Sequence, residues 1–363
     1  MNMRVTRSLC RTSSYCLIGM TILLFGCRSN PTAPPVETPV TATGIFVVNE
    51  GNFMRGNSTL TLYLPDSAKA YQDVFTSANG RPLGDTGNDI AVFAGKVYVV
   101  VSGSQKIEVI SATDQKSVGT LVLSGQRNPY KLAIVSDARA YVTNLSDTTV
   151  TSFNPSTLQI IADRIRVGKN PQGIAYANGK IYVCNSGFGF DSTVTVLNAT
   201  TGSLIKTIVA GDSPSEIGVG ANNEVFVKCD GRSDYGDPTK DTPGSLVAIN
   251  SDNDVIINKA ILSLSTFGHP GRMTVGAKGY GFFVSKSGIQ QFRLSNSLIE
   301  INVTLISPLV AYGLTLDDSA NLLYATDARD YVQNGEVLIF DLQGAQKAKF
   351  PAGVIPGAIA FKR

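Results

Sequence analysis

A repeat of about 42 residues constrains the fold of this chain more than any other feature. Each copy has a turn with Pro or Gly, an apolar segment, a second turn, and a segment with an aromatic residue near its start. One copy runs from residue 128 to 144 and the next from 170 to 185. Pro129, Pro171 and Pro214 are 42 and 43 residues apart. Such regular spacing indicates one structural unit repeated along the chain.

The unit itself is made of short β-strands. Two further alternating segments follow each pair, for example residues 149–153 and 159–162, joined by an Asn-Pro-Ser-Thr turn. Four short strands in 40 to 45 residues are typical of one blade of a β-propeller. No segment shows sustained helical periodicity, which indicates an all-β fold.

The number of blades follows from counting the strand pairs. Six pairs begin near residues 87, 130, 172, 215, 271 and 312. Residues 357–362 match an inner strand with nothing after it, and residues 45–49 match a second strand with nothing before it. The two ends complete one another. The sequence therefore predicts a seven-bladed propeller whose first blade is closed by strands from both termini, which leaves no open ring edge.

The N-terminal segment reads as an export signal. Arg4, Arg7 and Arg11 precede an apolar run over residues 17–25 that is too short to span a bilayer as a helix. Residues 28–43 contain four prolines and several threonines, which is typical of an extended tether. We expect a signal peptide over 1–27, a tether over 28–43 and a propeller domain over 44–363.

The end of the signal resembles a bacterial lipobox. Leu24, Phe25 and the small Gly26 stand directly before Cys27, although the bulky Phe25 departs from the usual pattern. The resemblance implies cleavage before Cys27 and lipidation of its sulfur, which would hold the protein at a membrane. An ordinary secretory signal or a short membrane anchor is the alternative, and either would still export the domain.

The charge of the mature domain argues against nucleic-acid binding, and its cysteines leave two interpretations open. The first 27 residues remove three of the 31 basic residues and none of the 28 acidic ones, so 28 of each remain. A neutral domain without a Lys/Arg cluster does not have the footprint of a nucleic-acid-binding protein. Cys184 and Cys229 lie near the ends of equivalent strands, where a disulfide and two small buried thiols are both open.

One tetrapeptide carries a family resemblance. Residues 141–144 spell YVTN, which names the YVTN-repeat (YncE-like) family of seven-bladed propellers, and residues 182–185 differ from it by one letter. Residues 48–52 and 78–89 also look like a group of propeller lipoproteins common in Bacteroidetes. Some members of that group capture vitamin B12 for a TonB-dependent outer-membrane transporter. The resemblance implies a lipid-anchored outer-membrane location, at the cell surface or the periplasmic face.

A binding face is predicted from the propeller's connections. The loops from outer to inner strands and from second to third strands share one face, where propellers usually bind ligands. Three of these loops are longer than a minimal corner and mix aromatic with polar residues: 50–57, 230–243 and 327–335. The ligand-binding candidates on this face are Asn49, Glu50, Phe53, Arg55, Asp89, Tyr130, Lys131, Asn144, Gln172, Asn185, Glu216, Asp230, Arg272, Tyr312 and Asp327. Solvated turn residues are the alternative interpretation.

Neither catalysis nor a metal site is indicated. The chain has one histidine, His269, in a turn before Pro270, which leaves no partner for a nucleophile and no multi-histidine metal site. The acidic spacing over residues 230–237 does not follow a calcium-loop pattern. We predict no enzyme, no catalytic residue, no metal and no cofactor.

Two functional hypotheses follow. The first is an envelope lipoprotein that captures a small molecule, such as a corrinoid, on the loop face and passes it to a transporter. The alternative is a scaffold or adhesion module that binds an envelope protein or a glycan.

Overall fold

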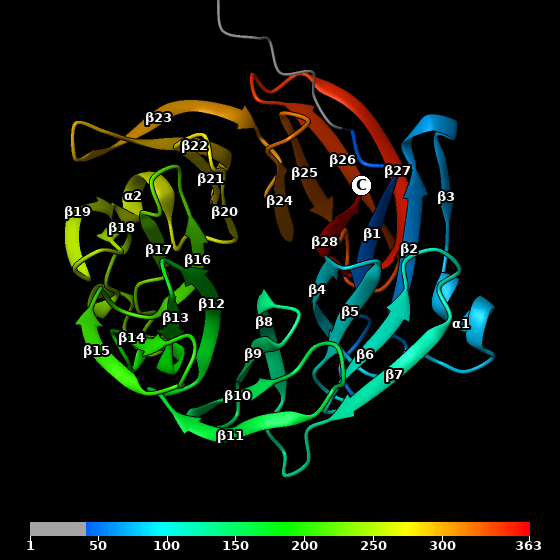
Figure 1. The fold of residues 1–363 in the computed structure, drawn as a ribbon. Coiled ribbons are helices and arrows are strands. Elements are labelled where there is room, and N and C mark those ends of the chain that lie inside the picture. The colour runs from blue at the N-terminus through cyan, green and yellow to red at the C-terminus, as the bar shows by residue number, and fades with distance from the viewer. Residues whose placement is uncertain (1–40) are drawn as a thin grey trace, which may run out of the picture. The chain divides into compact units, whose positions relative to one another are not determined.

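The computed structural model describes residues 41–363, which form seven four-stranded antiparallel sheets arranged around a central axis (Figure 1). The predicted signal peptide, Cys27 and most of the tether lie outside these residues. The predicted all-β, seven-bladed fold is confirmed. Within this part of the chain, no helix is long and apolar enough to cross a membrane.

Each blade runs from an inner strand at the axis to an outer strand at the circumference. Blades 1 to 4 are, from inside to outside, β28 (Pro356–Lys362), β1 (Gly44–Asn49), β2 (Thr59–Leu64), β3 (Lys69–Tyr71); β4 (Gly87–Phe93), β5 (Lys96–Val101), β6 (Lys106–Ser111), β7 (Ser117–Val122); β8 (Pro129–Ser136), β9 (Arg139–Asn144), β10 (Thr149–Phe153), β11 (Ile160–Arg166); and β12 (Pro171–Ala177), β13 (Lys180–Asn185), β14 (Thr193–Asn198), β15 (Leu204–Val209).

Blades 5 to 7 follow the same order. Their strands are β16 (Pro214–Val219), β17 (Val225–Cys229), β18 (Gly244–Asn250), β19 (Val255–Leu262); β20 (Met273–Val275), β21 (Tyr280–Ser285), β22 (Gly288–Ser295), β23 (Leu298–Ser307); and β24 (Gly313–Asp317), β25 (Leu322–Asp327), β26 (Asn334–Asp341), β27 (Gln346–Val354).

Blade 1 closes the ring as predicted. The C-terminal strand β28 pairs antiparallel with β1, with Ile359 opposite Val47 and Lys362 opposite Gly44. Ile359 is only 7% exposed and belongs to the apolar cluster that joins blade 1 to blade 7. The last strand is therefore part of the core, not an appended end.

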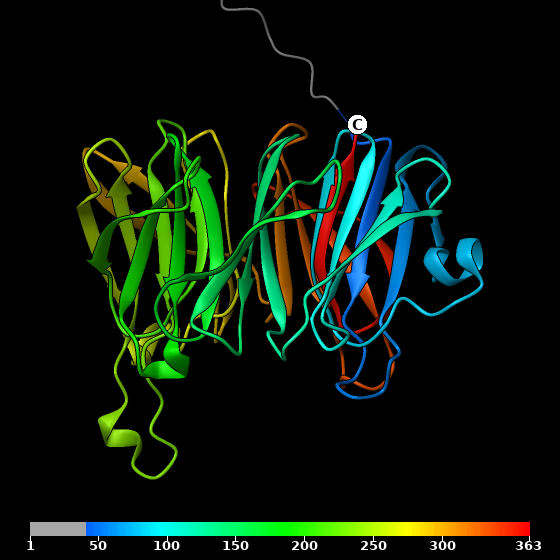
Figure 2. The ribbon, with the colours of Figure 1, turned by 60° about the horizontal axis from the view of Figure 1, so that its bottom comes forward.

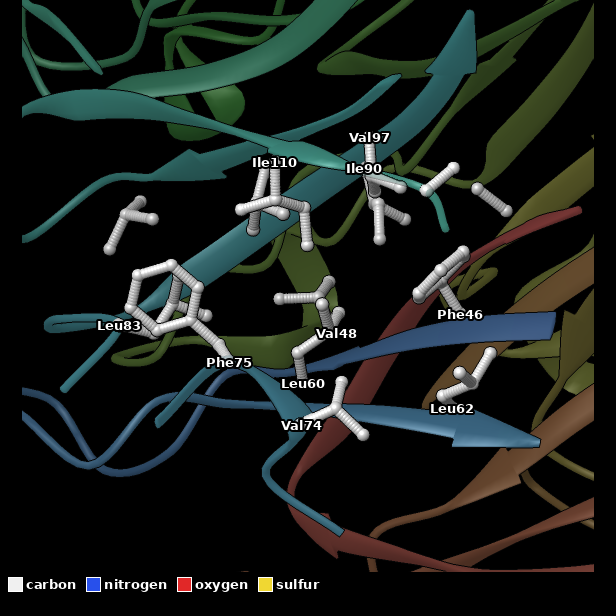
Figure 3. Packing of buried hydrophobic residues seen from close by; sticks show 14 residues of the cluster. Phe46, Val48, Leu60, Leu62, Val74, Phe75, Leu83, Ile90, Val97 and Ile110 are labelled. Carbon is white, nitrogen blue, oxygen red and sulfur yellow. The ribbon is translucent and has the colours of Figure 1, made fainter. Parts of the chain in front are cut away.

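The core lies between the blades. Figure 3 shows one of these layers, in which Phe46 and Leu60 of blade 1 face Ile90 and Val97 of blade 2. Phe75 of the connection between these blades completes the cluster and is fully buried. Alternate strand residues thus pack against one neighbouring blade and then the other, as the period of two predicts.

Three residues of the YVTN tetrapeptide, Tyr141, Thr143 and Asn144, make side-chain hydrogen bonds that stabilise the blades. The Tyr141 hydroxyl donates to the Ala199 carbonyl of the next blade at 2.9 Å. Thr143 Oγ1 donates to the Gln172 carbonyl, also of the next blade, at 3.0 Å. The Asn144 amide donates to Thr149 and Thr151 within its own blade, at 2.9 and 3.1 Å. The Tyr141 and Thr143 bonds therefore connect two neighbouring blades, and the Asn144 bonds stabilise the end of its own blade.

Short helices interrupt the connections, which the sequence analysis did not predict. They are η1 (Pro65–Ser67), α1 (Val74–Asn79), η2 (Gly187–Gly189), η3 (Pro238–Lys240) and α2 (Leu264–Phe267). Helix α1 begins at Asp73, whose side chain accepts from the Thr76 amide, and ends at Gly80 in the left-handed conformation.

The two faces of the propeller differ. Figure 2 shows the long β17–β18 loop projecting from one face, while the C-terminus lies at the other. Strand β1 starts at Gly44 beside Lys362, on the face of the C-terminus, and runs toward the loops. The residues around Thr43, whose amide donates to the Lys362 carbonyl at 2.8 Å, therefore enter at the face opposite the long loops. We call the face with the long loops the loop face.

Among the residues that the structure describes, Cys184 and Cys229 are free and buried. Both belong to the apolar cluster between blades 4 and 5. Burial raises the pKa of Cys229 to about 12, as expected for an unreactive thiol.

Candidate functional site

Charged side chains from several blades meet where the central channel opens on the loop face. Asp89, Lys131, Glu216 and Arg272 occupy equivalent positions at the start of the inner strands of blades 2, 3, 5 and 6. The remaining inner strands have small residues there, and a Cβ atom at Gly313 would collide with the Gly357 carbonyl. The repeat therefore places these charges at one height around the axis.

The charges form ion pairs between neighbouring blades. Lys131 Nζ lies 3.3 Å from Asp89 Oδ1, and Arg272 Nη1 lies 2.8 Å from Glu216 Oε1. Burial disfavours the charged forms of both Lys131 and Glu216, but the oppositely charged neighbours have the larger combined effect. Asp89 holds the pKa of Lys131 above its usual value. Arg272 holds the pKa of Glu216 below its usual value. These pairings favour the charged forms of Lys131 and Glu216.

Glu50, from the loop after β1, joins this network. Its Oε2 accepts from the Tyr312 hydroxyl at 2.8 Å, and its Oε1 lies 3.7 Å from Arg272 Nη2 without a hydrogen bond. The residue is 7% exposed, and burial raises the pKa of its carboxyl group. A buried acceptor without a donor is costly.

A second pair lies beside the first. Lys228 Nζ is 2.6 Å from Asp230 Oδ1, which also accepts from the Ser215 hydroxyl at 2.6 Å. Lys228 also donates to the Pro270 and Gly271 carbonyls of the next blade. Lys228 is not among the predicted site residues, although a lysine within the otherwise apolar second strand Val225–Cys229 was a signal.

Two hollows open at these charges. One, of about 230 Å³, lies in the channel and contacts Asp89, Lys131, Glu216 and Arg272. The other, of about 290 Å³, lies at the channel mouth. Its polar side contains Gln172, Ser215, Glu216, Lys228, Asp230 and Arg272, and its apolar side contains Val310, Ala311, Tyr312 and Tyr331.

Most predicted site residues meet at this mouth. Tyr130 lies beside Lys131, with the Lys131 Nζ 5.8 Å from the ring centre. Glu50, Asp89, Lys131, Gln172, Glu216, Asp230, Arg272 and Tyr312 all line the hollows or bond to residues that do. Phe53 and Arg55 are exposed on the β1–β2 loop, and half-buried Asp327 accepts from the Arg329 amide.

Three predicted ligand contacts are not accessible. Asn49, Asn144 and Asn185 are 0% exposed. Each donates to two threonines of the following strand, so each holds its own blade together. These side chains leave no exposed surface for a ligand in this structure, so they are not part of the site at the channel mouth.

His269 has a structural role. Its Nδ1 lies 2.9 Å from the Asp230 carbonyl oxygen and its Nε2 lies 3.4 Å from Asp241 Oδ2. These contacts tie the β17–β18 loop to the connection between blades 5 and 6. Asp241 is half-buried, and a bond from the Asp234 amide, helped by His269, lowers the pKa of its carboxyl group.

Comparison with known proteins gives a family. The model of a family described as "Domain of unknown function (DUF5074)" matches residues 43–345. The chain belongs to this family. The match covers all seven blades except the strands at the C-terminal end, so the DUF5074 domain here is the propeller. No curated protein matches the chain.

Solved propellers resemble this DUF5074 chain in fold. A quinoprotein alcohol dehydrogenase-like protein of Bacteroides thetaiotaomicron has a TM-score of 0.66 at 18% identity, covering 89% of this chain and 79% of its own. A candidate 6-phosphogluconolactonase of Bacteroides uniformis has a TM-score of 0.65 at 11% identity, covering 88% and 99%. Hydrazine synthase of Kuenenia stuttgartiensis has a TM-score of 0.62 at 14% identity, covering 76% and 89%. Identities this low establish the fold and leave activity open.

Proposed function

We propose that this protein is an envelope-anchored lipoprotein that binds a small molecule on the loop face, capturing a corrinoid or similarly large cofactor for a TonB-dependent transporter. One observation carries the proposal. Side chains from all seven blades converge on two adjoining hollows that share Glu216 and Arg272. Buried charges are costly, and clustered ones are typical of a binding site.

A corrinoid would be larger than either hollow. Volumes of about 230 and 290 Å³ accommodate only part of a cofactor-sized molecule. The part of the ligand outside the hollows would contact the surrounding loops, where large apolar side chains are exposed. These side chains are Phe53, Met54, Phe188, Phe190, Tyr235, Val310, Tyr331 and Val332. Aromatic rings give contact area at a low entropic cost.

The predicted lipid anchor is compatible with this use of the loop face. The propeller starts at Gly44, on the face opposite the loops. An anchor at Cys27 would therefore leave the loop face free to receive a ligand, and 16 residues of Pro/Thr-rich chain separate the anchor from the propeller. The same arrangement suits an outer-membrane position beside a transporter.

We infer binding rather than catalysis. The candidate lactonase among the structural neighbours raises the enzyme alternative, but its identity to this chain is 11%. At the channel mouth, the carboxylates Asp89, Glu216 and Asp230 are each held by a cation of their own. Paired carboxylates are poor general bases, and His269 is occupied in loop contacts.

A scaffold that binds another envelope protein is the second candidate. Met54, Phe188 and Tyr331 have φ of 61°, 49° and 64°, a conformation that bulky residues avoid. Their side chains are 78%, 60% and 53% exposed. Strained residues that expose apolar side chains suit a protein contact as well as a ligand contact.

Titration with cyanocobalamin tests the capture role. We would use the Cys27→Ser protein, which cannot be lipidated, and follow heat and absorbance. We expect saturable binding that the Arg272→Gln variant weakens at least about tenfold. Arg293→Gln is the matched control, because Arg293 also pairs with a glutamate, Glu300, on the exposed edge of blade 6. No heat and no spectral change with the unmutated site would reject the corrinoid and favour the scaffold.

A further inference from the structure

The charges at the channel mouth are balanced in each hollow. The channel hollow contacts the carboxylates of Asp89 and Glu216 and the cations of Lys131 and Arg272. The mouth hollow contacts Glu216 and Asp230, with Lys228 and Arg272. Each hollow is thus lined by two acids and two bases.

Every one of these charges already has a partner. The three ion pairs, Lys131–Asp89, Arg272–Glu216 and Lys228–Asp230, have N–O distances of 3.3, 2.8 and 2.6 Å. An ionic ligand would have to break a pair or enter without a counter-charge, and both are costly in a buried site. The site therefore disfavours ionic groups.

Glu50 strengthens this conclusion for anions. It adds a carboxyl group whose Oε1 has no hydrogen-bond donor and lies 3.7 Å from Arg272. When ionised, it gives the group around the mouth one carboxylate more than it has cations. An anion therefore meets no unpaired positive charge there.

An ion pair presents an acceptor beside a donor, and its neutral complement is a donor beside an acceptor. We propose that this site recognises a primary carboxamide, whose carbonyl accepts from the Arg272 guanidinium while its NH₂ donates to the Glu216 carboxylate. Both groups line both hollows. The amide then adds two charge-assisted hydrogen bonds without breaking the pair.

The body that carries the amide is a ring or another apolar group. Opposite the polar side, the mouth is lined by Val310, Ala311, Tyr312 and Tyr331. The Tyr312 and Tyr331 rings meet edge to face with centres 5.8 Å apart, and Tyr331 is 53% exposed. The inference rests on the proposed function only in that it concerns the same site.

Nicotinamide and nicotinate form the matched probe pair, because they share one ring and differ in an amide against a carboxylate. We would measure their dissociation constants for the Cys27→Ser protein by ligand-observed NMR at pH 7. We expect millimolar binding of nicotinamide and at least about tenfold weaker binding of nicotinate. Equal binding of the two, stronger binding of nicotinate, or no binding of nicotinamide up to about 50 mM would overturn the proposal.

A charge variant gives an independent test. Glu216→Gln leaves Arg272 without its closest carboxylate, so we expect this variant to bind nicotinate more tightly than nicotinamide. Glu300→Gln, which disrupts the exposed Arg293–Glu300 pair, should keep the original preference. An unchanged preference in a folded Glu216→Gln protein would contradict the assignment. Nicotinamide binding without cobalamin binding would reject the corrinoid as ligand and support the carboxamide site. Cobalamin binding without nicotinamide binding would support the corrinoid and reject the carboxamide site.

Discussion

Replacing Asn185 by Ala tests whether the buried asparagine at the end of residues 182–185, the segment that resembles YVTN, holds its blade together. The Asn185 amide donates to Thr193 and Thr195, both at 2.9 Å, and its oxygen accepts from the Gly168 amide at 3.0 Å. The substitution removes all three bonds. At a net value of about 1 kcal/mol each, the free energy of unfolding should fall by about 3 kcal/mol.

Asn144 provides the matched comparison in the preceding blade. It also donates to two threonines, Thr149 and Thr151, but its Oδ1 has no hydrogen-bond partner. Asn144→Ala removes the same atoms from an equally buried position, so the cavity contributions nearly cancel. It should cost about 2 kcal/mol, which is about 1 kcal/mol less than Asn185→Ala.

Equilibrium unfolding in urea measures the difference, and cobalamin titration of the same proteins measures function. We expect the midpoint of Asn185→Ala to fall further than that of Asn144→Ala at a similar slope, with ligand affinity unchanged in both. The reasoning is refuted if Asn185→Ala destabilises no more than Asn144→Ala. It is also refuted if either variant keeps its stability and loses binding, since these residues would then contact the ligand.

Three further predictions follow from other contacts. Deleting residues 358–363 removes most of the strand that closes blade 1, so circular dichroism and size exclusion should show loss of the cooperative fold rather than a small destabilisation. Burial opposes ionisation of Glu108, but bonds from Arg81 and Lys106 lower its pKa. The ionised Glu108 carboxylate therefore contributes fully to the free energy of unfolding above the ordinary pKa of a glutamate. This contribution is lost as the pH falls through the lowered pKa of Glu108 in the folded protein. Urea unfolding should therefore show a larger loss of stability below about pH 4.5 in the native protein than in Glu108→Gln. Phe188→Gly relieves a left-handed φ of 49° and should raise the unfolding free energy by about 0.5–1 kcal/mol while weakening binding at the loop face; a destabilised variant would contradict the strain argument.

The fold was predictable because its signals repeat. Pro129, Pro171 and Pro214, spaced 42 and 43 residues apart, reveal the repeat, the alternating strands after each turn define the blades, and incomplete units at both ends define the closure. Helix α1 was missed because six residues are too few to show a helical period, although Asp73 and Gly80 stand at its caps.

The site was predictable only in part. Equivalent positions in the repeat placed Asp89, Lys131, Glu216 and Arg272 at one height, but not their pairing, which depends on side-chain reach between blades. Glu50 and Tyr312 are 262 positions apart, and no local pattern connects them. The burial of Asn49, Asn144 and Asn185 was not predictable, because an amide at the end of a strand can bond to a turn, a ligand or a neighbouring hydroxyl equally well.

Hydrogen–deuterium exchange with and without cyanocobalamin tests the central claim most directly, because it locates the ligand on the molecule. We predict slower exchange in the loops that surround the channel mouth, at residues 50–58, 230–243 and 308–312, and no change in the turns of the opposite face. Protection on the opposite face or on the outer strands, or no protection anywhere at saturating ligand, would contradict the account.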